Sequence, residues 1–214
     1  MFRWVSSLKW LALGAMAISF GAGAQQQFAE GTNFIRLKNP QPVESGAKIE
    51  VIEFFSYGCN HCRDLEEFLG PWEKKVPADV AFKRVPVAFQ AAWTNLGKIY
   101  YTLEALGRGD LTIKVFQAIH TARLNMSEEK VFLDWAKNNG LDEAKVKELW
   151  NSFSVNSKMN RARTLASNYG VDGVPMLFVD GKFKVQPHLL RNSHKDVPAA
   201  LDFLIAKAKS ERNK

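Results

Sequence analysis

The stretch IEVIEFFSYGCNHC, residues 49–62, decides the fold class of this chain. Residues 49–55 are rich in β-branched and aromatic side chains and predict a buried strand. From Cys59 onward the apolar residues recur at helical spacing, which predicts a helix that is interrupted near Pro71. Residues 81–87 form a second predicted strand, so the segment has the strand-helix-strand order of a βαβ unit.

The rest of the chain is helical in its middle and returns to strands near its end. Five segments within 93–169 carry apolar residues every three or four positions, which predicts as many helices. Strands are predicted at 176–179 and 182–185, and the Asp180-Gly181 pair between them is typical of a type I′ hairpin turn. A last amphipathic helix follows. Strand-bearing segments therefore flank an all-helical insert.

The first 24 residues have the pattern of a targeting segment. Arg3 and Lys9 make its beginning positive, residues 10–20 are an apolar run, and small residues precede a cleavage point after Ala24. A run of eleven mostly apolar residues falls short of the roughly 20 that a helix needs to cross the membrane. We therefore expect a cleaved signal peptide over residues 1–24 rather than a membrane anchor.

The composition is that of a globular chain with one domain, or one domain that carries an insert. Of 214 residues, 46% are apolar and 24% charged, with 29 Lys and Arg against 22 Asp and Glu. The net charge of +7 is scattered, with no run of five or more like charges, which disfavours nucleic acid binding. Two cysteines cannot build a disulfide-stapled scaffold, so they need another explanation.

The two cysteines lie three positions apart, after a strand and at the start of a helix. The first sulfur, that of Cys59, then faces unpaired backbone N–H groups and the positive end of the helix dipole, which favour a thiolate. His61 adds a second positive influence. We expect Cys59 to be the attacking and leaving sulfur with a low pKa, and Cys62 to be the shielded resolving thiol.

Two other uses of the cysteine pair stay open at this point. The pair could be half of a zinc site, but such a site needs four ligands, and His120, His188 and His194 show no paired spacing. It could also be a structural disulfide, although a bridge that closes so short a loop restricts the unfolded chain little.

Val174-Pro175 and Glu53 are the other candidates for a functional role. A cis bond before Pro175 would lay backbone polar groups beside the cysteines, but an ordinary trans turn fits the sequence too. Glu53 lies inside the apolar strand, where a carboxylate needs a partner or a proton. Lys83 on the neighbouring strand is the candidate partner. Glu53 could relay protons to the dithiol or point to solvent at the margin of the sheet.

These features together resemble the DsbA family of periplasmic thiol:disulfide interchange proteins. The residues that carry the resemblance are EFFSYGCNHC at 53–62 and the later Gly173-Val174-Pro175 with its strand hairpin. The resemblance implies an α/β, thioredoxin-like fold with an inserted all-helical domain. It divides the mature chain into a first thioredoxin part (25–90), the helical insert (91–160) and a second thioredoxin part (161–214).

The resemblance also implies an activity and its participants. The protein would give its Cys59–Cys62 disulfide to reduced, unfolded secreted proteins and be reoxidised by a quinone-linked inner-membrane partner of the DsbB type. It would act in the periplasm as a monomer, without metal or organic cofactor. The roles implied are catalysis by Cys59, Cys62, His61 and the cis-proline Pro175, substrate contact by Val174 and Asn60, and proton relay by Glu53 and Lys83, where the match of Lys83 is looser.

One residue departs from the family pattern. Asn60 stands where the family usually has proline, and residues between the cysteines tune the redox balance. We expect a somewhat weaker oxidant that still oxidises. Alternatives are a periplasmic isomerase or reductase of the same superfamily, or a redox-silent binding module. We also expect the helical insert to form one wall of an apolar peptide groove near Cys59.

Overall fold

The computed structural model describes Met1 and residues 28–213, so the predicted signal peptide lies, apart from Met1, outside the described residues. The described part contains a five-stranded sheet in the order β1-β5-β4-β2-β3. The interior strand β2 runs parallel to β3 and antiparallel to β4. The strand bounds are β1 Ile35–Arg36, β2 Ile49–Phe55, β3 Val80–Pro86, β4 Met176–Val179 and β5 Phe183–Val185.

Strand β2 is buried on both faces, as its apolar sequence predicts. On one face Ile49 and Val51 pack with apolar residues of α1 (Asn60–Glu73) and α7 (Val197–Arg212). On the other face Ile52 and Phe54 pack with residues of α6 (Phe153–Asn168). The strand therefore lies between two helical layers of an α/β domain, and this packing holds its carboxyl end in place.

Helix α1 continues through Pro71, and the predicted interruption is wrong. The residue before a proline usually leaves the helical region because its Cβ clashes with the proline ring. Here that residue is Gly70, which has no Cβ. Proline also removes the N–H that would bond the carbonyl four residues back, but this residue is the exposed Glu67, where water can replace the bond.

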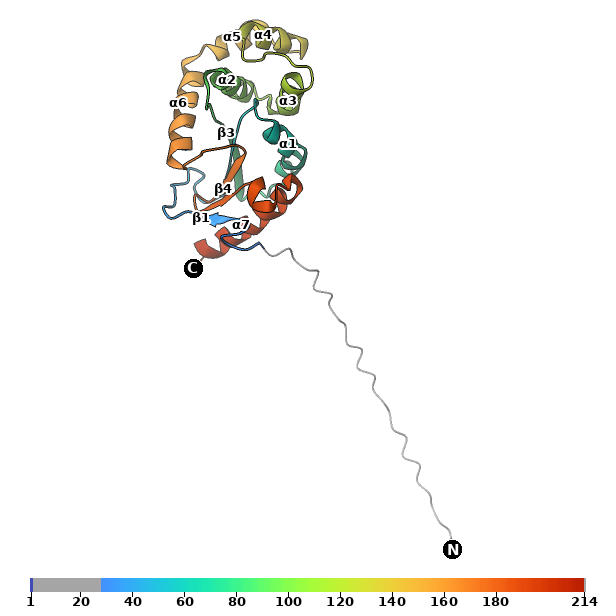
Figure 1. Cartoon of the computed structure of the whole chain (residues 1–214), viewed down its shortest axis with the longest axis vertical. Coiled ribbons are helices and arrows are strands. Elements are labelled where there is room, and N and C mark those ends of the chain that lie inside the picture. The colour runs from blue at the N-terminus through green and yellow to red at the C-terminus, as the bar shows by residue number, and fades with distance from the viewer. Residues whose placement is uncertain (2–27, 214) are drawn as a thin grey trace.

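The expected helices of the insert are present between β3 and α6. Asp142 caps one of them by accepting a hydrogen bond from the Lys145 N–H at 2.9 Å. Helix α6 runs without a break across residue 160, so the division of the chain there stays a prediction. Figure 1 shows α4 and α5 at the opposite end of the molecule from α7. The helix bounds are α2 Ala91–Ala105, α3 Thr112–His120, α4 Glu129–Asn138 and α5 Glu143–Trp150.

The predicted hairpin turn is confirmed. Asp180 and Gly181 have φ angles of 56° and 62°, as a type I′ turn requires. A Cβ at Gly181 would lie 2.0 Å from the carbonyl oxygen of Gln41, whose N–H donates to the Gly181 carbonyl at 2.8 Å. Glycine is therefore needed for both the turn and the close passage of the N-terminal segment.

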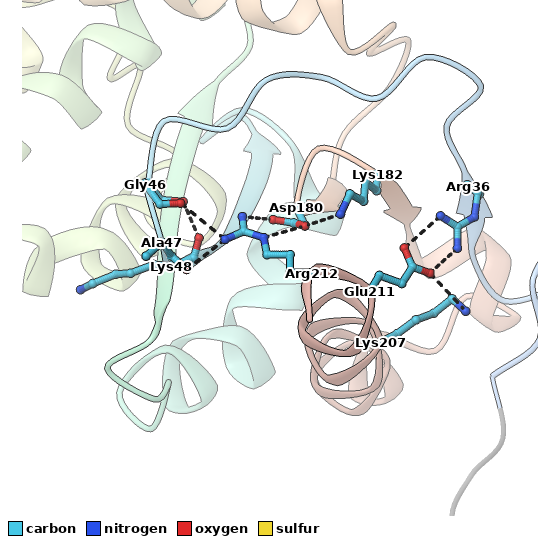
Figure 2. Close-up of polar contacts among 10 residues, drawn as sticks. Arg36, Gly46, Ala47, Lys48, Asp180, Lys182, Lys207, Glu211 and Arg212 are labelled. Carbon is cyan, nitrogen blue, oxygen red and sulfur yellow. Dashed lines mark hydrogen bonds and ion pairs between the residues drawn. The ribbon is translucent and has the colours of Figure 1, made fainter. Parts of the chain in front are cut away.

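Arg212, at the end of α7, ties three distant segments together (Figure 2). Its guanidinium donates to the buried Asp180 carboxylate, with Nε at 3.1 Å, and to the Ala47 carbonyl at 2.9 Å. Lys182 also contacts Asp180, at 2.9 Å.

Within the described part of the chain, no helix is long and apolar enough to cross a membrane.

Candidate active site

The turn that leads from β2 to α1 places Cys59 at the helix N-cap. The Cys59 N–H donates to the Ser56 carbonyl at 3.0 Å, and the Gly58 N–H donates to the Ser56 hydroxyl at 3.1 Å. Cys59 itself has extended backbone angles (φ −96°, ψ 120°), and helix α1 begins at Asn60. Its sulfur therefore lies next to the first N–H groups of α1, as the sequence predicts.

The helical insert holds this turn from one side. His120 of α3 hydrogen bonds to the Tyr57 carbonyl at 2.8 Å, and the Tyr57 hydroxyl lies 3.4 Å from the Thr112 hydroxyl. A Cβ at Gly58 would lie 2.6 Å from Nε1 of Trp93 in α2, so glycine allows the turn to pass under the indole. The sequence analysis considered His120 only as a zinc ligand and missed this contact, because nothing local links residues 63 positions apart.

The pKa of the Cys59 thiol is lowered from 9.0 to about 6. The largest cause is a hydrogen bond from the Cys62 side chain, and burial opposes it. Backbone N–H groups of Cys62 and His61 and the positive charge of His61 lower the pKa further. Cys59 is 9% exposed, so only a small part of its surface is open to a partner.

Cys62 has the opposite environment. It lies inside the first turn of α1 with an exposed fraction of 1%. Burial is the largest cause that raises its pKa well above the ordinary value, and the neighbouring Cys59 adds to it. Both cysteines are free thiols in this structure. The two sulfurs thus differ in burial and acidity in the direction that the sequence predicts.

The Val174-Pro175 peptide bond is cis, which confirms one of the two possibilities that the sequence left open. The Val174 carbonyl oxygen lies 3.4 Å from the Cys59 sulfur and accepts its hydrogen bond. Backbone polar groups of this loop therefore do lie beside the cysteine.

Among the described residues, no three His, Cys, Asp or Glu side chains come together as a set of metal ligands.

Glu53 is buried, and its partner is Arg84 rather than Lys83. Glu53 faces Arg84 across the β2–β3 pair, and the Arg84 Nε lies 3.0 Å from its carboxylate. Lys83 faces Ile52, so its side chain is on the opposite face of the sheet. There it contacts the carboxylates of Glu50 at 3.0 Å and Glu44 at 3.3 Å. The predicted Glu53–Lys83 pair is wrong, because neighbouring strand residues point to opposite faces.

Arg84 is shared by three carboxylates. Besides Glu53 it contacts Glu66 at 3.0 Å and Glu73 at 2.7 Å. One cation cannot neutralise three anions in a buried site, so the cluster favours proton uptake. Burial is the largest cause that raises the pKa of Glu53, to about 8; Arg84 opposes it, and the negative charges of Glu66 and Glu73 support it. A charge on Glu53 in turn raises the pKa of Cys62, so the protonation of the acid and that of the buried thiol are linked.

A thioredoxin-like sheet, a Cys-x-x-Cys pair at a helix start and a cis-proline beside it define a thiol:disulfide oxidoreductase of the thioredoxin superfamily. Comparison with known proteins makes this more specific. The family model described as a DSBA-like thioredoxin domain matches residues 50–191. The chain therefore belongs to the DsbA family.

Individual relatives cover almost the whole chain. The thiol:disulfide interchange protein DsbA of Bordetella parapertussis is 38% identical over 201 residues, which are 93% of this chain and 95% of the relative. The protein of the same name from Pseudomonas aeruginosa is 36% identical over 205 residues, 95% and 97% of the two chains. The crystal structure of Pseudomonas aeruginosa DsbA superimposes with a TM-score of 0.82 at 34% identity and covers 87% of this chain and 97% of that one.

The acidity of Cys59 can be measured by titration. In the reduced protein we expect the ultraviolet absorbance of the thiolate to appear with a midpoint near pH 6, and Cys59→Ser to abolish this step. Because the folded pKa lies below the unfolded value of 9.0, the thiolate stabilises the reduced protein above pH 9, and this stability is lost as the pH falls through about 6. The free energy of unfolding, relative to reduced Cys59→Ser, should therefore rise from pH 6 to pH 9. A midpoint near 9 would contradict the assignment.

The state of Glu53 predicts a pH dependence of opposite sign. A carboxyl whose pKa is raised from 4.5 to about 8 contributes stability that is full below pH 4.5 and is lost as the pH rises through 8. Glu53→Gln imitates the protonated acid at every pH. In the oxidised protein, where the cysteines do not titrate, the unfolding free energy of wild type minus that of Glu53→Gln should fall between pH 4.5 and 8. A difference that rises instead would mean that Glu53 is ionised in its pair with Arg84.

Proposed function

We propose that the protein introduces disulfide bonds into reduced, unfolded secreted proteins in the periplasm, with its own Cys59–Cys62 disulfide as the oxidant. The observation that carries this proposal is the position of Cys59 at the N-cap of α1 with the buried Cys62 one turn behind it. These positions lower the pKa of Cys59 and raise that of Cys62. A stabilised thiolate favours the reduced form of the enzyme, and a protein whose reduced form is favoured gives its disulfide away readily.

The exchange starts at Cys59. A client thiolate attacks the Cys59 sulfur, the Cys59–Cys62 bond breaks, and Cys62 leaves with the electron pair. Because Cys62 is buried and its thiol has a high pKa, it must take up a proton as it leaves. Glu53, whose raised pKa keeps it protonated near neutral pH and whose charge acts on Cys62, is the proposed source of that proton. The Arg84 cluster opens toward solvent through the half-exposed Glu73.

The second step releases the client. Another client thiolate attacks the client sulfur of the mixed disulfide, and Cys59 leaves as a thiolate. Its low pKa makes it a good leaving group. The client has lost two electrons and gained a disulfide, and the enzyme is left as the dithiol. Only sulfur chemistry is involved, so the proposal needs no metal or organic cofactor.

Client contact is assigned to residues around the sulfur. The Val174 backbone and Pro175 lie on one side of Cys59, and Asn60 is exposed on another. The insert is proposed as a wall of an apolar peptide groove. Support comes from Phe89, which is 50% exposed and whose ring centroid lies 6.0 Å from that of Trp93, with the two rings tilted. It also comes from the apolar cluster that joins the cysteines to the insert.

The protein would act as a monomer in the periplasm and be reoxidised by a quinone-linked membrane protein of the DsbB type. The targeting pattern of the first 24 residues and the family membership support this setting. Reoxidation runs the two exchange steps in reverse, with the membrane protein in place of the client. The Cys59 thiolate attacks the partner's disulfide, and Cys62 then attacks Cys59 in the mixed disulfide and forms the Cys59–Cys62 bond again.

Oxidation of a reduced client tests the function directly. The oxidised protein, mixed with a reduced unfolded secreted protein, should form one client disulfide for each Cys59–Cys62 disulfide that is consumed. Cys59→Ser should transfer none, because it removes the attacked sulfur. A protein that reshuffles scrambled disulfides without net oxidation would be an isomerase, and one that reduces client disulfides would be a reductase; either result would overturn the proposal.

Asn60 should make the protein a weaker oxidant than a proline at this position would. Its side-chain oxygen accepts the His61 N–H at 3.0 Å, and this N–H is one of the groups that lower the pKa of Cys59. Asn60→Ala frees the N–H for the thiolate, and Asn60→Pro is tolerated at the first position of α1. Both variants should lower the Cys59 pKa by about half a unit to one unit and shift the equilibrium with glutathione roughly three- to tenfold toward the reduced enzyme.

Asn60→Asp is the matched control for this prediction. It keeps an acceptor for the His61 N–H and adds a negative charge, so it should raise the Cys59 pKa and shift the equilibrium the other way. If Asn60→Ala left the equilibrium unchanged, competition for the N–H would be the wrong explanation of the role of Asn60.

A further inference from the structure

His194 lies beside the active site although the sequence gives it no role there. It begins a short 3-10 helix, His194–Asp196, which packs against α1. Its ring stacks on that of His61, with centroids 5.9 Å apart and an angle of 17° between the planes. Both rings line a pocket of about 260 Å³ whose other wall is the cis-proline loop with Val174 and Pro175.

The stack bears on Cys59 because His61 acts on the Cys59 sulfur by its charge. A charge stabilises a thiolate only when it is held close, since the interaction falls with distance and is weak in water. The His61 side chain is exposed, and an exposed side chain samples several rotamers unless a neighbour restricts it. His194 is the ring that His61 packs against, so it restricts where the positive charge lies.

The surroundings of His194 favour its neutral form. Burial and the charge of His61 lower its pKa, and Asp64 of α1, itself paired with Arg63, opposes them in part. Asp172 and His188 face the same pocket, and Lys195 and Asp196 follow on the same element. A neutral imidazole can stack on a charged one without repulsion, as a second imidazolium could not.

The stability of the fold does not explain why residue 194 is a histidine. Its Nε2 is buried and has no hydrogen-bond partner among the described residues, and the same holds for Oγ of the preceding Ser193. An unpaired buried polar atom is unfavourable, and an apolar ring of similar size would avoid it. We propose that His194 is a positioning residue, which stacks on His61 and holds its ring beside the Cys59 sulfur.

The test compares variants that remove or keep the stack. The readouts are the Cys59 pKa and the equilibrium of the Cys59–Cys62 pair with glutathione. His194→Ala removes the stack and should raise the pKa by about half a unit to one unit, which makes the enzyme roughly three- to tenfold less oxidising. His194→Phe keeps an aromatic face and should stay within about twofold of wild type. Thermal unfolding of the oxidised forms checks that each variant folds.

Dependence on His61 separates positioning from a general structural effect. In a His61→Ala background, His194→Ala should change neither readout, because the charge that His194 holds in place is gone. An equal effect in both backgrounds, no effect in either, or equal effects of His194→Ala and His194→Phe would overturn the inference. The inference rests on one part of the proposed function, namely that the charge of His61 stabilises the Cys59 thiolate. Client oxidation by wild type tests that function separately, so the two can fail independently.

Discussion

The Cys59 sulfur is held at the N-terminus of α1 by the burial of β2 between two layers of the fold. Because both faces of β2 are covered, its last residue, Phe55, cannot shift without disturbing two apolar clusters. Three residues then lead to Cys59, with hydrogen bonds inside the turn. Two cysteines of identical chemistry and one turn apart thus become unlike, since one meets the exposed N–H groups of the helix end and the other the interior.

In the proposed mechanism, the Arg84 cluster supplies the proton that the buried Cys62 thiol needs. A buried thiol with a high pKa must gain and lose a proton in every cycle, yet water does not reach it. Arg84 lets three carboxylates approach, but its single charge leaves the cluster short of cations, so a proton is retained where Glu53 lies. A fully neutralised ion pair would hold its geometry equally well but would have no proton to exchange.

The sequence predicts the parts of this structure that depend on local patterns. The strand at 49–55, the Asp180-Gly181 turn and the helical insert follow from side-chain period and turn chemistry. The identity of the Glu53 partner does not, because a one-residue change in register exchanges Lys83 for Arg84 and moves the side chain to the other face. The contacts of His120 and His194 were missed for a related reason: they join segments that only the folded chain brings together. Helix α1 continues through Pro71 because Gly70, which has no Cβ, does not clash with the proline ring. Glycine and proline both usually interrupt a helix, so the sequence pattern alone predicts a break there.

The residues around Cys59 are held from two directions. The insert fixes the turn before Cys59, through His120 on the Tyr57 carbonyl and Trp93 over Gly58. The last third of the chain borders Cys59 and the residues after it, through the Val174 carbonyl and the ring of His194. The backbone is therefore constrained on both sides, and the sulfur lies among polar groups of Cys62, His61 and Val174 that this packing holds in place. Such a site has little reorganisation to undergo when the sulfur changes between thiolate and disulfide, because the groups that stabilise the charge are already in place.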